Sequence, residues 1–397
     1  HNKTGSSNPK ILNAKLENNF LFSTNFDETG SLWKSDGTEN GTSIIKNLFI
    51  ENSKSYFYKG YIYFVASEEK NGKKKLWKTD GTESGTNVVK EFGSSSFDNI
   101  YSFKIMNGKL LIRFTETNVE RESELWISDG TGGGTIRLTE RSLLGELHLI
   151  EGVLNDKLIF TFRPRFLSHL ELWVSDGTIS GTQRIDDDLM LEEIVPTSYN
   201  FFDEKLFFIG VDENDDAEPW VSDGTLKGTF ILKDLNTDGS SYPYFFNENV
   251  YNQDKLMFIA NGGRAFTSIY LTDGTEQGTH SITDGNKWPP IGNYPYHMNE
   301  EKFYFLASYQ NNDLSLWVTN LKKEDTRLVY NFSENQGQVR FSDASLNDKV
   351  LFSISYNTGI NQIWVTDGTE ENTHLLSEDL NNISDFIGIS QTIGSSV

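Results

Sequence analysis

Aspartate residues recur along the chain, each within a variant of one short tract, Leu-Trp-x-Ser/Thr-Asp-Gly-Thr-x-x-Gly-Thr. The aspartates of this tract are Asp36, Asp80, Asp129, Asp176, Asp223, Asp273 and Asp367. Such a series of carboxylates could form repeated calcium sites, but each tract offers one carboxylate whereas Ca²⁺ takes about six to eight oxygen ligands. We therefore interpret each aspartate as a turn residue that accepts a backbone N–H two residues on, with Gly supplying the positive φ.

A second group of carboxylates forms the acidic run from Asp212 to Glu218. Its side chains at Asp212, Glu213, Asp215 and Asp216 are the best candidates for a calcium site. The run lacks the central glycine of an EF-hand loop, so a solvated acidic loop is the favoured interpretation. We expect no cofactor, with calcium at this run as the alternative.

Two arginines, Arg163 and Arg165, stand out against the acidic composition of the chain. Guanidinium groups so placed could hold a carboxylate or a sulfate. The alternative is that both are solvated, because exposed charges usually contribute little.

Aromatic residues gather in two segments that connect strands. One segment places Trp288, Tyr294 and Tyr296 among three prolines, and the other contains Tyr242 and Tyr244. Such rings could stack on a sugar or on the backbone of a partner. The alternative is that they pack between structural elements, as most large aromatic residues do.

Catalytic signatures are absent from the sequence. The chain has no cysteine, its six histidines lack paired metal-ligand spacing, and it contains no Gly-x-Ser-x-Gly tract. Two carboxylates from distant repeats could still form an acid and base pair for glycoside chemistry. A carbohydrate-active lyase or hydrolase therefore remains the alternative to a protein without catalytic activity.

The elements that position these residues follow from the repeat. Successive tracts are separated by 44 residues (Asp36 to Asp80) to 50 residues (Asp223 to Asp273), and a degenerate copy at Asn320 completes eight copies. In the third copy, apolar and polar residues alternate on either side of Asn107-Gly108, which predicts a β-hairpin. Each copy predicts four short antiparallel strands.

Eight four-stranded units of this length without helical periodicity predict an all-β fold, an eight-bladed β-propeller. The aromatic residues at the tryptophan position of the tract should then pack between neighbouring blades. They are Trp33, Trp77, Trp126, Trp173, Trp220, Tyr270, Trp317 and Trp364. We expect residues 1–9 to be disordered, residues 10–382 to form the propeller, and residues 383–397 to form a closing strand or a linker.

The seventh and eighth copies depart from the tract. Asn320 replaces the aspartate and Asp325 the second glycine of copy seven, while Asn372 replaces the second glycine of copy eight. We expect another turn type to serve in copy seven. We expect Asn372 to be tolerated because Asn enters the left-handed region readily.

The balance of 35 basic against 57 acidic residues gives a formal charge of −22. Such a charge repels nucleic acid and anionic lipid, so neither is an expected partner. No stretch approaches the roughly 18 consecutive apolar residues of a membrane helix, so direct membrane insertion is not expected either.

The tract Leu125 to Thr135, preceded by Glu124, resembles the ELWxxDGTxxGT repeat family of secreted and surface proteins, found mainly in Bacteroidetes and other environmental bacteria. The resemblance spans nearly the whole chain and departs from the family at the seventh copy. It implies a location outside the cell or on the surface of a Gram-negative bacterium. It also implies a role as an adhesin or as an accessory of gliding motility or type IX secretion, within a larger assembly.

Together these observations predict a non-catalytic interaction module that binds a protein or a glycan of the cell envelope through loops. Loops on one face of a rigid propeller can vary without disturbing the blades, which suits them to recognition.

Overall fold

The computed structural model describes residues 9–378 apart from short gaps. The gaps are residues 27–28, 51–53, 93–98, 117–121, 140–144, 166, 168, 186–190, 247–250, 253–254, 263–266, 284–295, 299–301, 310–312, 323–324, 333–336, 347–348 and 357–360. Almost all of the expected N-terminal segment 1–9, and all of the expected closing strand or linker 383–397, therefore lie outside the described residues.

Alternating apolar and polar residues form antiparallel hairpins, as the third copy illustrates. Asn107 and Gly108 have φ values of 49° and 66°, the left-handed pair that a two-residue hairpin turn needs. They join β9 (Asn99–Met106) to β10 (Lys109–Glu116), and β11 (Glu122–Ser128) and β12 (Thr135–Arg137) complete the sheet. The predicted hairpin is confirmed.

The chain divides into two compact units, His1–Leu189 with Gly224–Leu226, and Met190–Asp223 with Lys227–Val397. The first unit holds blades one to four. Blade three is given above, and the strands of the other three are β1 (Lys10–Leu16), β2 (Asn19–Phe26), β3 (Thr29–Ser35) and β4 (Ser43–Lys46); β5 (Ser55–Tyr58), β6 (Tyr61–Ala66), β7 (Lys75–Thr79) and β8 (Asn87–Glu91); β13 (Gly145–Leu154), β14 (Lys157–Pro164), β15 (Glu171–Ser175) and β16 (Gln183–Arg184).

The second unit holds the strands of blades five to eight. They are β17 (Leu191–Phe202), β18 (Lys205–Asp212), β19 (Ala217–Ser222) and β20 (Phe230–Ile231); β21 (Tyr244–Phe245), β22 (Tyr251–Asn252), β23 (Lys255–Asn261), β24 (Thr267–Thr272) and β25 (His280–Ser281); β26 (Tyr296–Met298), β27 (Phe303–Tyr309), β28 (Asp313–Thr319) and β29 (Arg327–Phe332); β30 (Gly337–Leu346), β31 (Lys349–Tyr356), β32 (Asn361–Thr366) and β33 (His374–Glu378). In blade six the first position is shared by β21 and β22, which both pair with β23.

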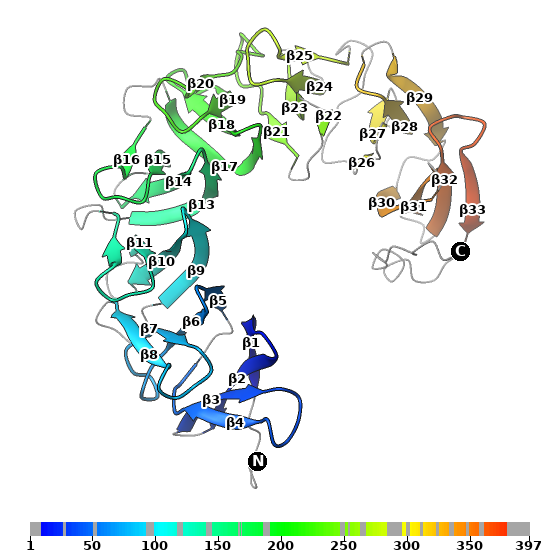
Figure 1. Cartoon of the computed structure of the whole chain (residues 1–397). Coiled ribbons are helices and arrows are strands. Elements are labelled where there is room, and N and C mark those ends of the chain that lie inside the picture. Colours follow the sequence, from blue (N-terminus) through cyan, green and yellow to red (C-terminus); the bar gives the residue numbers. More distant parts are fainter. Residues whose placement is uncertain are drawn as a thin grey trace. The chain divides into compact units, whose positions relative to one another are not determined.

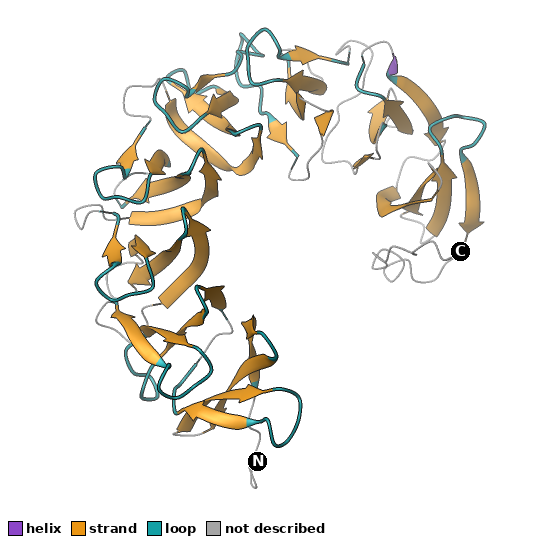
Figure 2. Ribbon diagram, in the orientation of Figure 1, coloured by secondary structure: helices purple, strands orange, loops and turns teal. Residues whose placement is uncertain are grey.

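Every blade is an antiparallel sheet whose strands pair in chain order, apart from the shared first position in blade six. Figures 1 and 2 show the blades as successive groups of arrows. This is the blade architecture of a β-propeller. The all-β class and the count of eight blades are confirmed. Within the described ranges, no helix has the length and apolar character needed to cross a membrane.

Apolar side chains pack between consecutive blades within each unit. Between blades one and two, Ile45 of β4 lies in one cluster with Phe64 of β6 and Trp77 of β7, and Trp77 is 2% exposed. The tract aromatic of the later blade occupies the same kind of cluster at the other described junctions, as Trp126, Trp173, Tyr270, Trp317 and Trp364. Packing of this kind holds adjacent blades together and fixes where their loops lie.

Candidate functional site

The repeated tract forms a turn that is closed by its own side chains. In blade one, Asp36 Oδ1 accepts the backbone N–H and the hydroxyl of Thr38, at 2.9 and 2.7 Å. Gly37 has a φ of 92°, and Thr38 Oγ1 accepts the N–H of Gly41 at 3.0 Å. The bonds from Thr38 lower the pKa of Asp36. The same backbone bond recurs at Asp80, Asp129, Asp176, Asp273 and Asp367.

The second glycine of the tract serves close approach rather than a left-handed backbone. A Cβ on Gly41 would lie 2.0 Å from Asp36 Oδ1, and Gly41 is not among the residues with positive φ. Our explanation for Asn372 is therefore wrong, because its φ is not positive either. Asn372 is accommodated by bonding, since its Nδ2 donates to Asp367 Oδ2 at 2.7 Å.

The tract turn of blade seven also contains an Asn–Asp side-chain pair, but with the two residue types exchanged. Asn320 Nδ2 donates to Asp325 Oδ2 at 2.6 Å, so the amide and the carboxylate have exchanged positions relative to blade eight. Leu321 takes the place of the first glycine at a φ of 65°, and its side chain is 5% exposed within the cluster of blades six and seven. Burial of this side chain offsets the unfavourable backbone of a non-glycine residue.

The glutamate that opens the tract satisfies the indole of its tryptophan. In blade four, Trp173 Nε1 donates to Glu171 Oε2 at 3.0 Å, while Arg184 Nη1 lies 3.0 Å from Glu171 Oε1. Arg184 sits opposite Trp173 on the neighbouring strand. Glu124, Trp126 and Arg137 repeat this arrangement in blade three.

Blade five has the glutamate and the tryptophan but lacks the arginine, because Ile231 lies opposite Trp220. Glu218 is 2% exposed and turns to other donors: its Oε1 accepts the N–H of Ser241 at 2.8 Å, and its Oε2 that of Leu235 at 3.0 Å. Burial raises the pKa of Glu218 to about 7, which these hydrogen bonds oppose and the charge of Asp234 reinforces.

The two amides belong to the connection between β20 and β21, residues 232–243, which we call the Tyr242 loop (Figure 1). Ala217 O accepts the N–H groups of both Ser241 and Tyr242, at 3.0 and 3.1 Å, and Ser240 Oγ accepts the N–H of Ala217 at 2.9 Å. The N–H of Asn261 donates to Ser241 O at 2.7 Å. The loop is thus bonded to β19 of blade five and to β23 of blade six.

This network displays Tyr242 on a strained backbone. Tyr242 has a φ of 44°, which is unfavourable for a bulky residue and also for a residue that precedes a proline, here Pro243. The Tyr242 side chain is nevertheless 71% exposed, so burial of its ring does not offset the strain. Strain that surrounding bonds maintain at an exposed side chain is a signal of function.

Tyr244 follows on β21 and is 39% exposed, with its ring 5.6 Å from that of Phe246 in an edge-on contact. Phe245 and Phe246 are 0% and 2% exposed. The chain thus divides its aromatic residues here between the core and the surface. We refer to the exposed rings of Tyr242 and Tyr244 as the Tyr242 surface.

The acidic run forms the neighbouring turn, between β18 and β19. Asp212 Oδ1 accepts the N–H groups of Asn214 and Asp216, at 2.8 and 3.1 Å, and Asp215 has a φ of 67°. Asp212 therefore shapes its own turn. No cluster of three or more potential metal ligands occurs among the residues that the structure describes, and calcium at Asp212, Glu213, Asp215 and Asp216 stays a prediction.

The described structure does not test whether the other predicted ligand residues lie near the Tyr242 surface. Trp288 and Tyr294 lie outside the described residues, and for Tyr296 only the backbone, in β26, is described. Arg163 and Arg165 belong to the first unit, at the end of β14 and just beyond it, and both are half-buried. The sequence analysis counted Glu218 only as the end of the acidic run and missed its contacts with the Tyr242 loop, although Ile231 at the arginine position was a signal.

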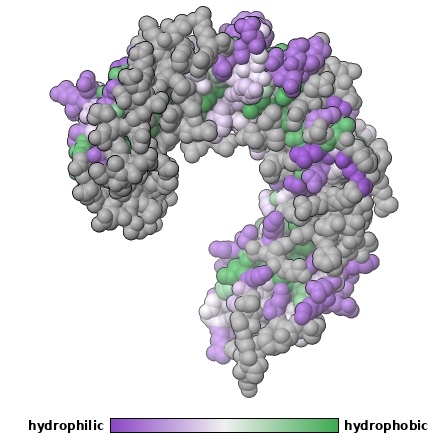
Figure 3. Space-filling model, turned by 180° about the vertical axis from the view of Figure 1, so that it is seen from behind, coloured by the Kyte–Doolittle hydropathy of each residue, from purple (hydrophilic) through white to green (hydrophobic). Residues whose placement is uncertain are grey.

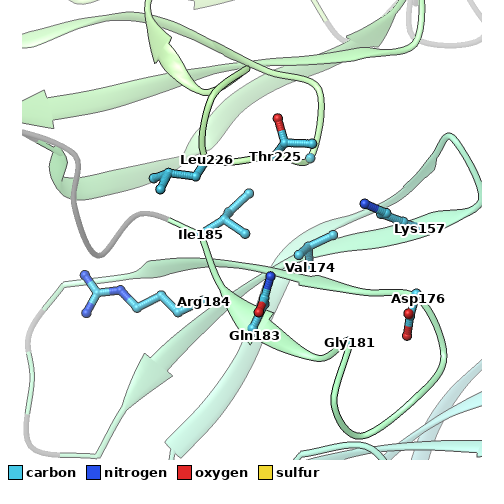
Figure 4. A pocket seen from close by; sticks show the side chains of 10 residues that line it. Lys157, Val174, Asp176, Gly181, Gln183, Arg184, Ile185, Thr225 and Leu226 are labelled. Atoms are coloured by element: carbon cyan, nitrogen blue, oxygen red, sulfur yellow. The ribbon is translucent and has the colours of Figure 1, made fainter.

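A pocket of about 440 Å³ lies in the first unit beside the tract turn of blade four. Val174, Ile185 and Leu226 line its apolar part, with Lys157 and Arg184 toward opposite sides (Figure 4). A second pocket, of about 310 Å³, is lined by Lys34, Asp80, Gly81 and Thr82 of the first two blades. The two pockets share repeat positions, Val174 with Lys34 and Gly224 with Gly81, so this pocket occurs at more than one place in the repeat.

Hydropathy does not identify a binding surface on the face that Figure 3 draws. Among the described residues there, hydrophobic ones form separate small groups among hydrophilic ones. Small groups of this kind are ordinary on soluble proteins. The Tyr242 surface is distinguished by its backbone and its bonding instead.

No protein-family model and no curated protein matches this chain. Solved structures are similar to it at low sequence identity. One is a prolyl endopeptidase, 12% identical over 82% of this chain and 49% of its own, with a TM-score of 0.39. Another is oligopeptidase B from Leishmania major, 11% identical over 84% of this chain and 48% of its own, with a TM-score of 0.40.

A third similar structure is the β-propeller domain of the Trilobed protease from Pyrococcus furiosus, 15% identical over 70% of this chain and 84% of its own, with a TM-score of 0.31. This chain spans about half the length of the two peptidases above. At these scores the likeness carries no argument about function. The fold rests on the strand order and the packing of the blades themselves.

Proposed function

We propose that the chain is a non-catalytic binding module that holds a protein or a carbohydrate on the Tyr242 surface. The observation that supports this is the exposure of Tyr242 at a φ of 44°, maintained by bonds from Ala217, Glu218 and Asn261. A ring held in advance in its binding position loses little conformational entropy when a partner arrives. Tyrosine suits such a place because one side chain offers both an apolar face and a hydroxyl.

The setting that we propose follows the resemblance of the tract to secreted and surface repeats. The partner would be a protein or glycan of the envelope of a Gram-negative bacterium, and the module would act as an adhesin or as an accessory of gliding or type IX secretion. The acidic net charge of −22 supports a partner other than nucleic acid or anionic lipid.

The test uses the full chain, a panel of purified neutral and acidic bacterial polysaccharides, and purified envelope proteins. Tyr242→Gly removes the ring and relieves the backbone, so the fold is retained while binding falls by about tenfold or more. Phe230→Ala is the matched control, because Phe230 is a 41% exposed aromatic residue on β20 in the same unit. Equal binding by wild type and Tyr242→Gly would overturn the proposal.

The same polysaccharides test the competing activity. A lyase or hydrolase would release shorter, reducing or unsaturated products from at least one of them, with or without added calcium. We expect none, and product formation that survives Tyr242→Gly would replace the binding role with an enzymatic one.

A further inference from the structure

Glu218 stands at a repeat position whose usual partners are known from the chain itself. In blades three and four, the glutamate at this position lies between the tryptophan indole and an arginine on the next strand. In blade eight a neutral residue replaces it: Gln362 Oε1 accepts Trp364 Nε1 at 2.9 Å, and Leu375 lies opposite Trp364. In these three blades the charged acceptor occurs with arginine and the neutral acceptor with leucine.

Blade five breaks this correspondence. It combines a charged acceptor, Glu218, with the apolar Ile231. Trp220 is 3% exposed, and its Nε1 has no hydrogen-bond partner among the described residues. A buried donor without an acceptor is uncommon and needs an explanation. The natural acceptor of this indole is two residues away and is bonded to Leu235 and Ser241 instead.

We propose that Glu218 is the positioning residue of the Tyr242 surface, and that it holds the Tyr242 loop because Ile231 stands where an arginine would draw its carboxylate toward Trp220. The carboxylate has two alternative sets of donors: the loop amides, or the indole with an added guanidinium. The carboxylate gives each amide its own charged oxygen, whereas a neutral amide side chain has a single, uncharged acceptor oxygen. This inference rests on the proposed function and states how its site is held.

The test converts blade five to the arrangement of blade four. Ile231→Arg places a guanidinium where Arg184 lies opposite Trp173, and Ile231→Met is the neutral control of similar size. At pH 8, we expect the indole N–H resonance of Trp220 to move downfield only in Ile231→Arg, as expected for a new hydrogen bond. We also expect the amides of residues 232–243 to exchange hydrogen about tenfold faster. Binding to the panel of polysaccharides and envelope proteins should fall in the same variant.

A second variant covers the case in which Ile231→Arg does not fold. Glu218→Gln should bond Trp220 as Gln362 bonds Trp364, and it should accelerate exchange in the same loop. An unchanged indole resonance and unchanged exchange in both variants would overturn the positioning role even if Tyr242→Gly abolishes binding. Faster exchange with unchanged binding would support the positioning role and overturn the proposed function at Tyr242.

Discussion

Blades four and five place the same residue type at the same repeat position and use it differently. In blade four, Glu171 lies between Trp173 and Arg184, so it contributes to the packing of its own blade. In blade five, Glu218 reaches out of its sheet to the amides of Leu235 and Ser241. This difference underlies our proposal that Glu218 holds the Tyr242 loop because isoleucine stands where blade four has arginine on the neighbouring strand.

Removal of the glutamate carboxylate in blade four should lower the stability of the protein the most. Glu171→Ala removes the acceptor of Trp173 Nε1 and the ion-pair partner of Arg184, and Glu171 is only 6% exposed. We expect the free energy of unfolding to fall by about 3 kcal/mol, measured by urea denaturation.

The control copies blade eight into blade four. Glu171→Gln combined with Arg184→Leu reproduces the pairing of Gln362 with Leu375, so it should lose only about 1 kcal/mol. If the double variant were less stable than Glu171→Ala, the correspondence between acceptor charge and arginine would be wrong.

The pH dependence of unfolding tests the burial of Glu218 in blade five. The pKa of Glu218 is raised by burial to about 7 from an ordinary value of 4.5. The folded state therefore binds the proton of the Glu218 carboxyl group more tightly than the unfolded state does. The contribution of this proton to the free energy of unfolding is fully present below pH 4.5 and is lost as the pH rises through 7. We expect Glu218→Gln to remove this part of the pH dependence of unfolding between pH 4.5 and 7.5, and Ile231→Arg to reduce it. A pH profile identical in the wild type and Glu218→Gln would contradict the burial of an ionisable group at this position.

Blade seven extends the comparison to the tract turn, with a smaller effect. Asn320→Asp sets a second carboxylate against Asp325 Oδ2, which Asn320 Nδ2 now contacts at 2.6 Å. We expect a loss of about 1 kcal/mol in thermal or urea unfolding, because the turn is exposed. Adding Asp325→Gly restores the pairing of the other blades and should recover the loss; failure to recover it would mean that the turn is stabilised in another way.

The smallest expected effect concerns the strain in the Tyr242 loop. Glycine at position 242 removes the steric conflict of a φ of 44°, so Tyr242→Gly should raise the free energy of unfolding by about 0.5–1 kcal/mol. Tyr244→Gly, at a residue that is not among those with positive φ, should not raise it. A loss of stability in Tyr242→Gly would show that the ring has structural contacts of its own.

Much of the fold could be predicted because the same sequence pattern occurs in eight copies. Spacing and alternation predicted the hairpin at Asn107-Gly108 and the number of blades, and both depend on local backbone preferences that the sequence states directly. The role of the second glycine could not be predicted in this way. Its need for close approach to Asp36 is visible only when the carboxylate and the glycine are placed together.

The candidate site was predicted in part. Tyr242 and Tyr244 were candidates from composition, but the strained backbone beneath Tyr242 has no sequence signature of its own. The contacts of Glu218 with the loop were not predicted, because Glu218 was counted with the acidic run. Ile231 at the arginine position was a signal in the sequence, but only the register of β19 and β20 shows that it faces Trp220.

A crystal structure of Ile231→Arg at pH 8 would show directly whether Glu218 holds the Tyr242 loop. We predict that the Glu218 carboxylate lies within hydrogen-bond distance of Trp220 Nε1 and of the new guanidinium, with the amides of Leu235 and Ser241 released. A Glu218 side chain that still accepts both amides in this variant would contradict the account.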